Sequence, residues 1–263
     1  MTQKSIAELF NLHGQTAVVT GGAMGIGFGI VLRLSEAGAN VVIADLYEVT
    51  GTKKVEELSA LGRKALFVKT DVSQEADVKN LINQTVKQFG RVDVLVNNAG
   101  IYPQKKVMEM DVEFWDKIQA VNERSVFLCC REAAKVMLGQ KSGSIINIGS
   151  IDSVHPSMVG LAAYDTSKHG VWGFTKNFAL EVAPSGIRVN VIAPGGIATE
   201  GVAKTMGGSE QMKAAVSQFA SRVPLGRMGE PDDIATVALF LASAASGYMT
   251  GSMMVVDGGV LLN

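Results

Sequence analysis

The chain has 263 residues, of which 47% are hydrophobic, so it can bury a large core and we expect one domain over residues 1–263. Its formal net charge is -1, and its scattered lysines and arginines form neither a basic face for nucleic acid nor a polybasic strip for anionic lipid. The N-terminus lacks the apolar core of a signal peptide, and no apolar stretch approaches the roughly 20 residues of a membrane helix. These features favour a cytoplasmic protein whose partners are small molecules and further copies of itself.

Short β-branched segments alternate along the chain with longer segments of helical pattern, which indicates βαβ units and a parallel sheet. Because the strands read as continuous apolar stretches, such as Val92–Val96, we expect helices to cover both faces of the sheet. The pattern predicts an α/β fold with a Rossmann-type, doubly wound parallel sheet. The predicted strands are residues 16–20, 40–45, 65–71, 92–97, 144–149, 188–193 and 253–257.

A glycine-rich segment follows the first predicted strand and leads into an apolar helix predicted from Phe28 to Ala37. Glycines at a strand-to-helix turn let the backbone approach a pyrophosphate, which the free N–H groups of the helix then bind. A glycine run alone would equally suit an ordinary tight turn. We predict cofactor binding here because an acidic residue follows at a suitable spacing, and the residues concerned are Gly21, Met24, Gly25, Ile26 and Gly27.

That acidic residue is Asp45, which ends the second predicted strand eighteen positions after Gly27. The spacing is close to the value of about 20 at which an acid binds the ribose hydroxyls of NAD. A carboxylate would repel the 2′-phosphate of NADP, and neither Met24 nor Leu46 supplies a compensating cation. We therefore expect NAD, with Asp45 and Leu46 beside the ribose, although Asp45 could instead cap the following helix.

The cysteines and histidines do not suggest a metal site. Cys129 and Cys130 are adjacent, which suits neither a long-loop disulfide nor metal ligation, so we expect two buried side chains on a helix. His13, His155 and His169 lie far apart and form no zinc-binding pattern.

A serine follows the predicted strand 144–149, at the sheet edge where open α/β sheets bind ligands. Ser150 could there hydrogen-bond a substrate oxygen and stabilise its developing charge. Ser153 is the alternative, but it is less well placed at the strand end.

Tyr164 and Lys168 are four residues apart in a predicted helix that extends to Phe178, so they share one face. A free tyrosine has a pKa of about 10, and a nearby ammonium favours its phenolate. Tyr164 could then accept the proton of an alcohol while hydride leaves for a nicotinamide, or donate a proton to a ketone. The alternative is a surface pair without a role.

Residues 195–222 are predicted to form an insertion that covers the substrate, together with the loop 151–161 and Tyr102. The insertion contains Val202, Met206, Met212 and Phe219, which favour a fairly apolar secondary alcohol or ketone. The same methionines could simply pack the insertion against the rest of the domain. In the loop, Asp152 and His155 would instead favour a polyol or sugar.

Together these motifs resemble the short-chain dehydrogenase/reductase superfamily of the classical type, over nearly the whole chain. The glycine segment matches its Thr-Gly-x-x-x-Gly-x-Gly pattern, and the Asn-Asn-Ala-Gly sequence at 97–100 matches its signature after the fourth strand. The resemblance implies four catalytic residues, Asn122, Ser150, Tyr164 and Lys168, with Asn122 holding a water that contacts the lysine. Ser150 lies fourteen positions before Tyr164, one more than the family spacing.

The resemblance also implies further cofactor contacts and an assembly. Asp71 and Val72 match the adenine contact, Asn190 belongs to the stretch that borders the nicotinamide, and residues 257–259 match the C-terminal turn. Members of the family are usually tetramers or dimers, so we expect a homotetramer or a homodimer. The remaining cofactor contacts are expected at Asn98, Ala99, Gly100, Tyr164, Lys168, Pro194, Gly195, Ile197 and Thr199.

The predicted function is that of an NAD-dependent alcohol dehydrogenase or carbonyl reductase acting on a secondary alcohol and its ketone. A reductase of 3-oxoacyl thioesters is an alternative that Asp45 disfavours, because biosynthetic reductions usually use NADP. A polyol or sugar dehydrogenase is another alternative. A non-catalytic dinucleotide-binding protein is the least favoured, since a pure binder has no need of the four catalytic residues.

Overall fold

The computed structural model describes residues 3–199 and 220–262. In this part of the chain, seven strands form one parallel sheet in the order β3-β2-β1-β4-β5-β6-β7. The strand order reverses between β1 and β4, and in such sheets ligands bind outside the carboxyl ends of the strands at this point. The predicted fold is thereby confirmed. The strands are β1 Thr16–Thr20, β2 Asn40–Asp45, β3 Ala65–Lys69, β4 Val94–Asn97, β5 Gly143–Ile148, β6 Ile187–Pro194 and β7 Met253–Val256.

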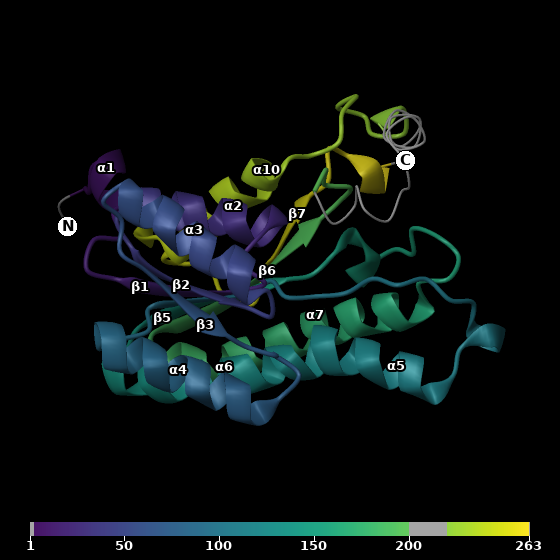
Figure 1. Cartoon of the computed structure of the whole chain (residues 1–263). Coiled ribbons are helices and arrows are strands. Elements are labelled where there is room, and N and C mark those ends of the chain that lie inside the picture. Colours follow the sequence, from purple (N-terminus) through teal and green to yellow (C-terminus); the bar gives the residue numbers. More distant parts are fainter. Residues whose placement is uncertain (1–2, 200–219, 263) are drawn as a thin grey trace.

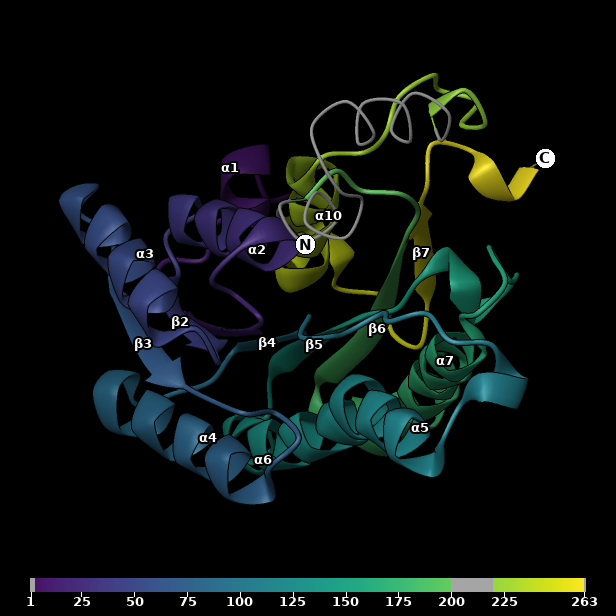
Figure 2. The ribbon, with the colours of Figure 1, turned by 45° about the vertical axis from the view of Figure 1, so that its right-hand side comes forward.

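Helices cover both faces of the sheet (Figures 1 and 2). One layer contains α1 Ile6–Leu9, α2 Gly25–Glu36, α3 Glu48–Ala60 and α10 Pro231–Ala242. The opposite layer contains α4 Glu75–Phe89, α5 Val112–Gln119, α6 Ser125–Gln140 and α7 Ala162–Val182. None of the described helices is long and apolar enough to cross a membrane.

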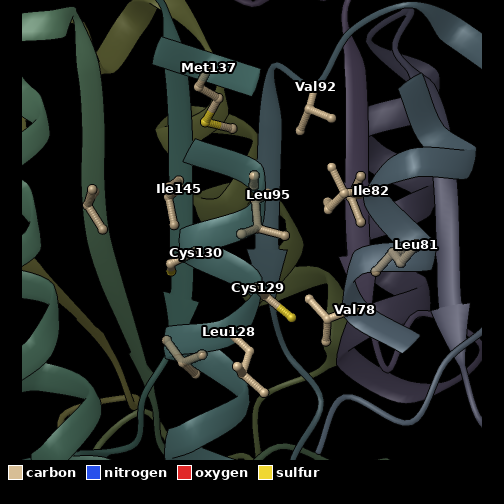
Figure 3. Packing of buried hydrophobic residues seen from close by; sticks show 14 of the residues in the cluster. Val78, Leu81, Ile82, Val92, Leu95, Leu128, Cys129, Cys130, Met137 and Ile145 are labelled. Atoms are coloured by element: carbon tan, nitrogen blue, oxygen red, sulfur yellow. The ribbon is translucent and has the colours of Figure 1, made fainter. Parts of the chain in front are cut away.

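The core divides into two hydrophobic clusters because successive strand residues point to opposite faces of the sheet. In β4, Leu95 packs in the cluster on the side of α4 and α6, whereas Val94 and Val96 pack in the cluster on the other side. Cys129 and Cys130 lie in the first cluster, near Leu95 (Figure 3). The expectation of two buried cysteines on a helix is confirmed.

Several predicted boundaries were wrong by one to three residues. The third strand ends at Lys69 rather than Asp71, because the Asp71 carboxylate accepts hydrogen bonds from Ser73 and turns the chain. The fourth begins at Val94 rather than Val92, whose N–H donates to the Gln140 side chain. Helix α2 begins at Gly25 rather than Phe28. The fifth and sixth strands differ by one residue at both ends and the seventh at one end, as helix and strand assignments commonly do.

Candidate active site

The glycine turn joins β1 to α2 at the carboxyl edge of the sheet. Gly21 and Gly25 have φ angles of +60° and +53°, in the left-handed region that favours glycine. A Cβ added at Gly27 would lie 2.0 Å from the Gly21 carbonyl oxygen, so any side chain there would collide with the backbone. Met24 precedes α2 and provides no side-chain cap, so the first N–H groups of the helix remain available to an anion. These features fit the pyrophosphate of a dinucleotide.

Asn98 ties the segment after β4 to this turn. Its side-chain amide donates to the Thr20 and Gly21 carbonyl oxygens, both at 3.0 Å. The backbone N–H groups of Asn98 and Ala99 donate to the Thr20 hydroxyl at 3.0 and 3.1 Å. Asn98 therefore braces the predicted cofactor site through its side chain, a role that the sequence pattern did not indicate for it or for Thr20.

Asp45 lies beside the turn, as the spacing predicted, and is only 8% exposed. Its carboxylate accepts hydrogen bonds from the Ala23 N–H at 3.0 Å and the Tyr47 N–H at 3.1 Å. An ionised carboxylate has about four acceptor positions, so two remain for ribose hydroxyls. The second bond supports Tyr47, the residue that precedes α3, which agrees in part with the capping alternative, while the ribose contact stays a prediction.

The other expected cofactor contacts differ in what their side chains do. The Asp71 carboxylate accepts hydrogen bonds from the Ser73 N–H and hydroxyl, at 2.9 and 2.6 Å. Val72 and Ile197 are buried in the two hydrophobic clusters, so they would contact a cofactor mainly through their backbone. Leu46 is exposed and open to a ligand.

The segment that leaves β6 returns to the glycine turn. A Cβ added at Gly25 would lie 3.4 Å from the side chain of Thr199, which places this threonine next to the start of α2. Pro194 ends β6, and the Gly195 N–H donates to the Val256 carbonyl at 3.0 Å. Asn190 instead joins β6 to the turn before β7, through bonds to Met249 and Ser252. The greater part of the predicted insertion, residues 200–219, lies outside the described residues.

Tyr164 and Lys168 lie on one face of α7, as predicted. The Lys168 ammonium is 5.5 Å from the centre of the Tyr164 ring and donates to the Ile148 carbonyl at 2.8 Å. Lys168 is 5% exposed, and burial lowers its pKa to about 8, although Asp152 acts in the opposite direction. Burial raises the pKa of Tyr164 above its usual range, and a hydrogen bond with Ser150 partly offsets this. The phenol is therefore a proton donor at neutral pH.

The structure separates the two candidate serines. Ser150 follows β5, and its hydroxyl lies within hydrogen-bonding reach of Tyr164. Ser153 is 2% exposed, and its hydroxyl accepts a hydrogen bond from the Ser150 N–H at 3.3 Å. Residues 154–159 are exposed, so this loop can absorb the extra residue in the spacing. The geometry favours Ser150 as the group that meets a substrate.

Asn122 occupies a π-helical turn, Ala120–Arg124, between α5 and α6, rather than an ordinary helix position. Its amide accepts from the Ile101 N–H and donates to the Ile101 carbonyl, both at 2.8 Å. It also donates to the Ser167 hydroxyl at 3.2 Å. Such turns often occur at functional sites, and this one fixes the segment after β4 against α7.

Gly100 lies between Asn122 and Lys168. A Cβ at Gly100 would lie 3.4 Å from the Asn122 amide oxygen and 3.7 Å from the Lys168 ammonium. On the presumed substrate side, the Tyr102 ring meets the Tyr164 ring edge-on at 6.4 Å. Over residues 3–199 and 220–262, no group of three or more His, Cys, Asp and Glu residues is placed to hold a metal ion.

Comparison with known proteins gives consistent matches over nearly the whole chain. The family model described as enoyl-(acyl carrier protein) reductase matches residues 21–261. The 3-oxoacyl-(acyl-carrier-protein) reductase FabG of Chlamydia pneumoniae is 41% identical, over 95% of this chain and 98% of the relative. The 2-dehydro-3-deoxy-D-gluconate 5-dehydrogenase of Escherichia coli is 38% identical, over 97% and 99%. A crystal structure of a short-chain type dehydrogenase/reductase from Mycobacterium marinum superposes with a TM-score of 0.91 at 37% identity, over 98% and 100%.

Proposed function

The chain belongs to the classical short-chain dehydrogenase/reductase superfamily of oxidoreductases, and we propose that it interconverts a secondary alcohol and its ketone with NAD. The observation that carries this proposal is the grouping of Tyr164, Lys168 and Ser150 at the sheet edge where the glycine turn lies. A protein that only bound a dinucleotide would need the turn but not this grouping.

In the proposed mechanism, the glycine turn and Asp45 would hold a nicotinamide dinucleotide, which would supply or take up the hydride. Tyr164 transfers the proton: it donates to the oxygen of a ketone, or accepts from an alcohol once it is itself deprotonated. The Lys168 ammonium stabilises negative charge on the phenol oxygen and is held in place by the Ile148 carbonyl. Ser150 binds the reacting oxygen, and Asn122 positions the backbone beside Lys168.

The proposed preference for NAD over NADP rests on charge. The Asp45 carboxylate lies beside the glycine turn and would repel a 2′-phosphate. Lys69 pairs with Asp45 in the register of β2 and β3, but its ammonium lies 3.3 Å from the Glu48 carboxylate. Lys69 thus forms an exposed ion pair with Glu48, and Asp45 has no ion-pair partner among the described residues.

Two narrower activities use the same chemistry and remain alternatives: reduction of a 3-oxoacyl thioester and oxidation of a polyol or sugar. The direct test is to incubate the purified protein with NAD and a panel of secondary alcohols, polyols and 3-hydroxyacyl thioesters, and to follow NADH formation. The highest kcat/KM identifies the substrate class. Absence of NADH formation with every member of the panel would contradict the proposed function.

The one-domain organisation, the cytoplasmic location and the homotetrameric or homodimeric assembly expected from the sequence are part of the same proposal. Measurement of the molar mass in solution tests the assembly, and a stable monomer would contradict it.

A further inference from the structure

A buried carboxylate lies next to the proposed catalytic groups. Asp152 is 6% exposed and belongs to the short helical turn Ile151–Ser153 that follows Ser150. One of its oxygens, Oδ1, is buried without a hydrogen-bond partner among the described residues. A buried carboxylate oxygen without a partner destabilises a fold by about 1–3 kcal/mol, so its presence calls for a reason other than stability.

The hydrogen bonds around Ser150 provide that reason. The Ser150 hydroxyl donates to Asp152 Oδ2 at 2.8 Å and accepts from the Asp152 N–H at 3.1 Å. A hydroxyl has one proton and two lone pairs, so a single lone pair remains for Tyr164. A neutral Tyr164 can donate into it. A phenolate, or a negatively charged substrate oxygen, could bind Ser150 only by accepting the hydroxyl proton that Ser150 now donates to Asp152 Oδ2.

We propose that Asp152 is a positioning residue, which orients the Ser150 hydroxyl and places a carboxylate beside Tyr164 and Lys168. This inference rests on the proposed function of Tyr164 and Ser150. The site is thereby held in the form that gives a proton to a ketone, and the oxidation of an alcohol is displaced to higher pH.

The charged groups around Tyr164 support the proposed effect of Asp152 on the pH at which the alcohol is oxidised. Lys168 and Asp165 face it from α7, Asp152 and Ser150 from the turn after β5, and Tyr102 from the segment after β4. Burial is the largest cause of the raised pKa of Tyr164, and the Asp152 charge adds to it. The same charge counteracts the effect of burial on Lys168. Loss of this charge should lower the pKa of both groups.

The test compares Asp152→Asn, which keeps an acceptor for Ser150 but removes the charge, with Asp152→Ala, which removes both. Asp116→Asn is the matched control, because Asp116 is an exposed carboxylate on α5. We expect Asp152→Asn to move the rising limb of the pH profile for alcohol oxidation down by about one pH unit. Tyr164 sets this rising limb, because its phenolate is the base for alcohol oxidation, whereas loss of the Lys168 proton would lower activity. Asp152→Ala should lower kcat by about tenfold and change KM less.

A second measurement does not depend on turnover. The free energy of unfolding by urea is measured for the unmodified protein and for Asp152→Asn between pH 6 and pH 10. The difference should be largest where Lys168 is charged and should shrink as the pH rises through about 8. A pH-independent difference, together with an unmoved pH profile, would overturn the inference. Absence of turnover in all variants would count against the proposed function, while the unfolding data would still decide the role of Asp152.

Discussion

The ammonium of Lys168 lies 5.5 Å from the centre of the Tyr164 ring, one helical turn along α7, and donates to the Ile148 carbonyl at 2.8 Å. This contact puts a cation with a pKa of about 8 inside the protein, next to a phenol whose pKa burial raises. The ammonium and the phenol attract each other only weakly when the phenol is neutral, and strongly when it is ionised. The pair is thus suited to move a proton.

The first prediction concerns Lys168→Met. Because the folded-state pKa of Lys168 lies below the unfolded value of about 10.4, the unfolded chain binds more protons between these two values. The stability of the unmodified protein should therefore rise with pH from about 8 to about 10. In Lys168→Met this rise should be absent. The free energy of unfolding at pH 7 should be unchanged or higher by roughly 1–3 kcal/mol. The kcat value should fall at least about 100-fold. Urea unfolding and steady-state kinetics measure these effects, and full activity in the variant would contradict the role of Lys168.

The second prediction distinguishes the two serines. Ser150→Ala should lower kcat by roughly 10²-fold, because the reacting oxygen loses a hydrogen bond in the transition state. Ser153→Ala is the matched control in the same turn and should keep kcat within a few-fold, while destabilising the fold by about 1 kcal/mol through loss of its bond to the Ser150 N–H. The reverse pattern of kcat values would assign the catalytic role to Ser153.

The third prediction concerns cofactor choice. Asp45→Ser should raise the ratio of kcat/KM for NADP to that for NAD by about tenfold or more, because the repulsion of the 2′-phosphate is removed. Leu46→Arg, added to Asp45→Ser, should raise the ratio further by supplying a cation. Asp116→Ser is the control, since Asp116 is an exposed carboxylate on α5, in the helix layer opposite α2. An unchanged ratio in the double variant would show that another part of the chain selects the cofactor.

The fourth prediction tests the glycine turn. Gly27→Ala should abolish NADH binding or destabilise the protein by about 3 kcal/mol, because its Cβ would meet the Gly21 carbonyl at 2.0 Å. Gly173→Ala is the control: Gly173 is an exposed position of α7 with open space around it, and alanine there should stabilise the helix by about 0.5–1 kcal/mol. NADH titration by fluorescence and thermal unfolding separate the two effects. Unimpaired binding by Gly27→Ala would contradict the assignment of this turn.

Much of this arrangement could be predicted from the sequence, because it follows from the hydrophobic periodicity of the strands and helices and from the spacing of the motif residues. Parallel strands bring their carboxyl ends to one edge, so Asp45 and the glycine turn had to meet there, and a spacing of four put Tyr164 and Lys168 on one helix face. The exact strand ends could not be predicted, because side chains replace ladder bonds there: Gln140 of α6 binds the distant Val92 N–H, and Asp71 turns the chain locally.

What the sequence did not indicate depends on contacts between distant segments. The bonds of Asn122 to Ile101 and Ser167 require the π-helical turn, which has no simple sequence signal. Asp152 was expected only as a loop residue that would favour a polyol or sugar substrate, and its bond to Ser150 depends on the local turn geometry. A carboxylate two residues after a candidate serine is the signal that could have suggested this contact.

The central claim is that Tyr164 transfers the proton, and Tyr164→Phe tests it most directly. Turnover with the best substrate of the panel and the dissociation constant of NADH are measured for both proteins in parallel. The account predicts that NADH binding changes by no more than a few-fold while kcat falls by about 10²-fold or more. Equal kcat values in the two proteins, with NADH bound equally well, would contradict it.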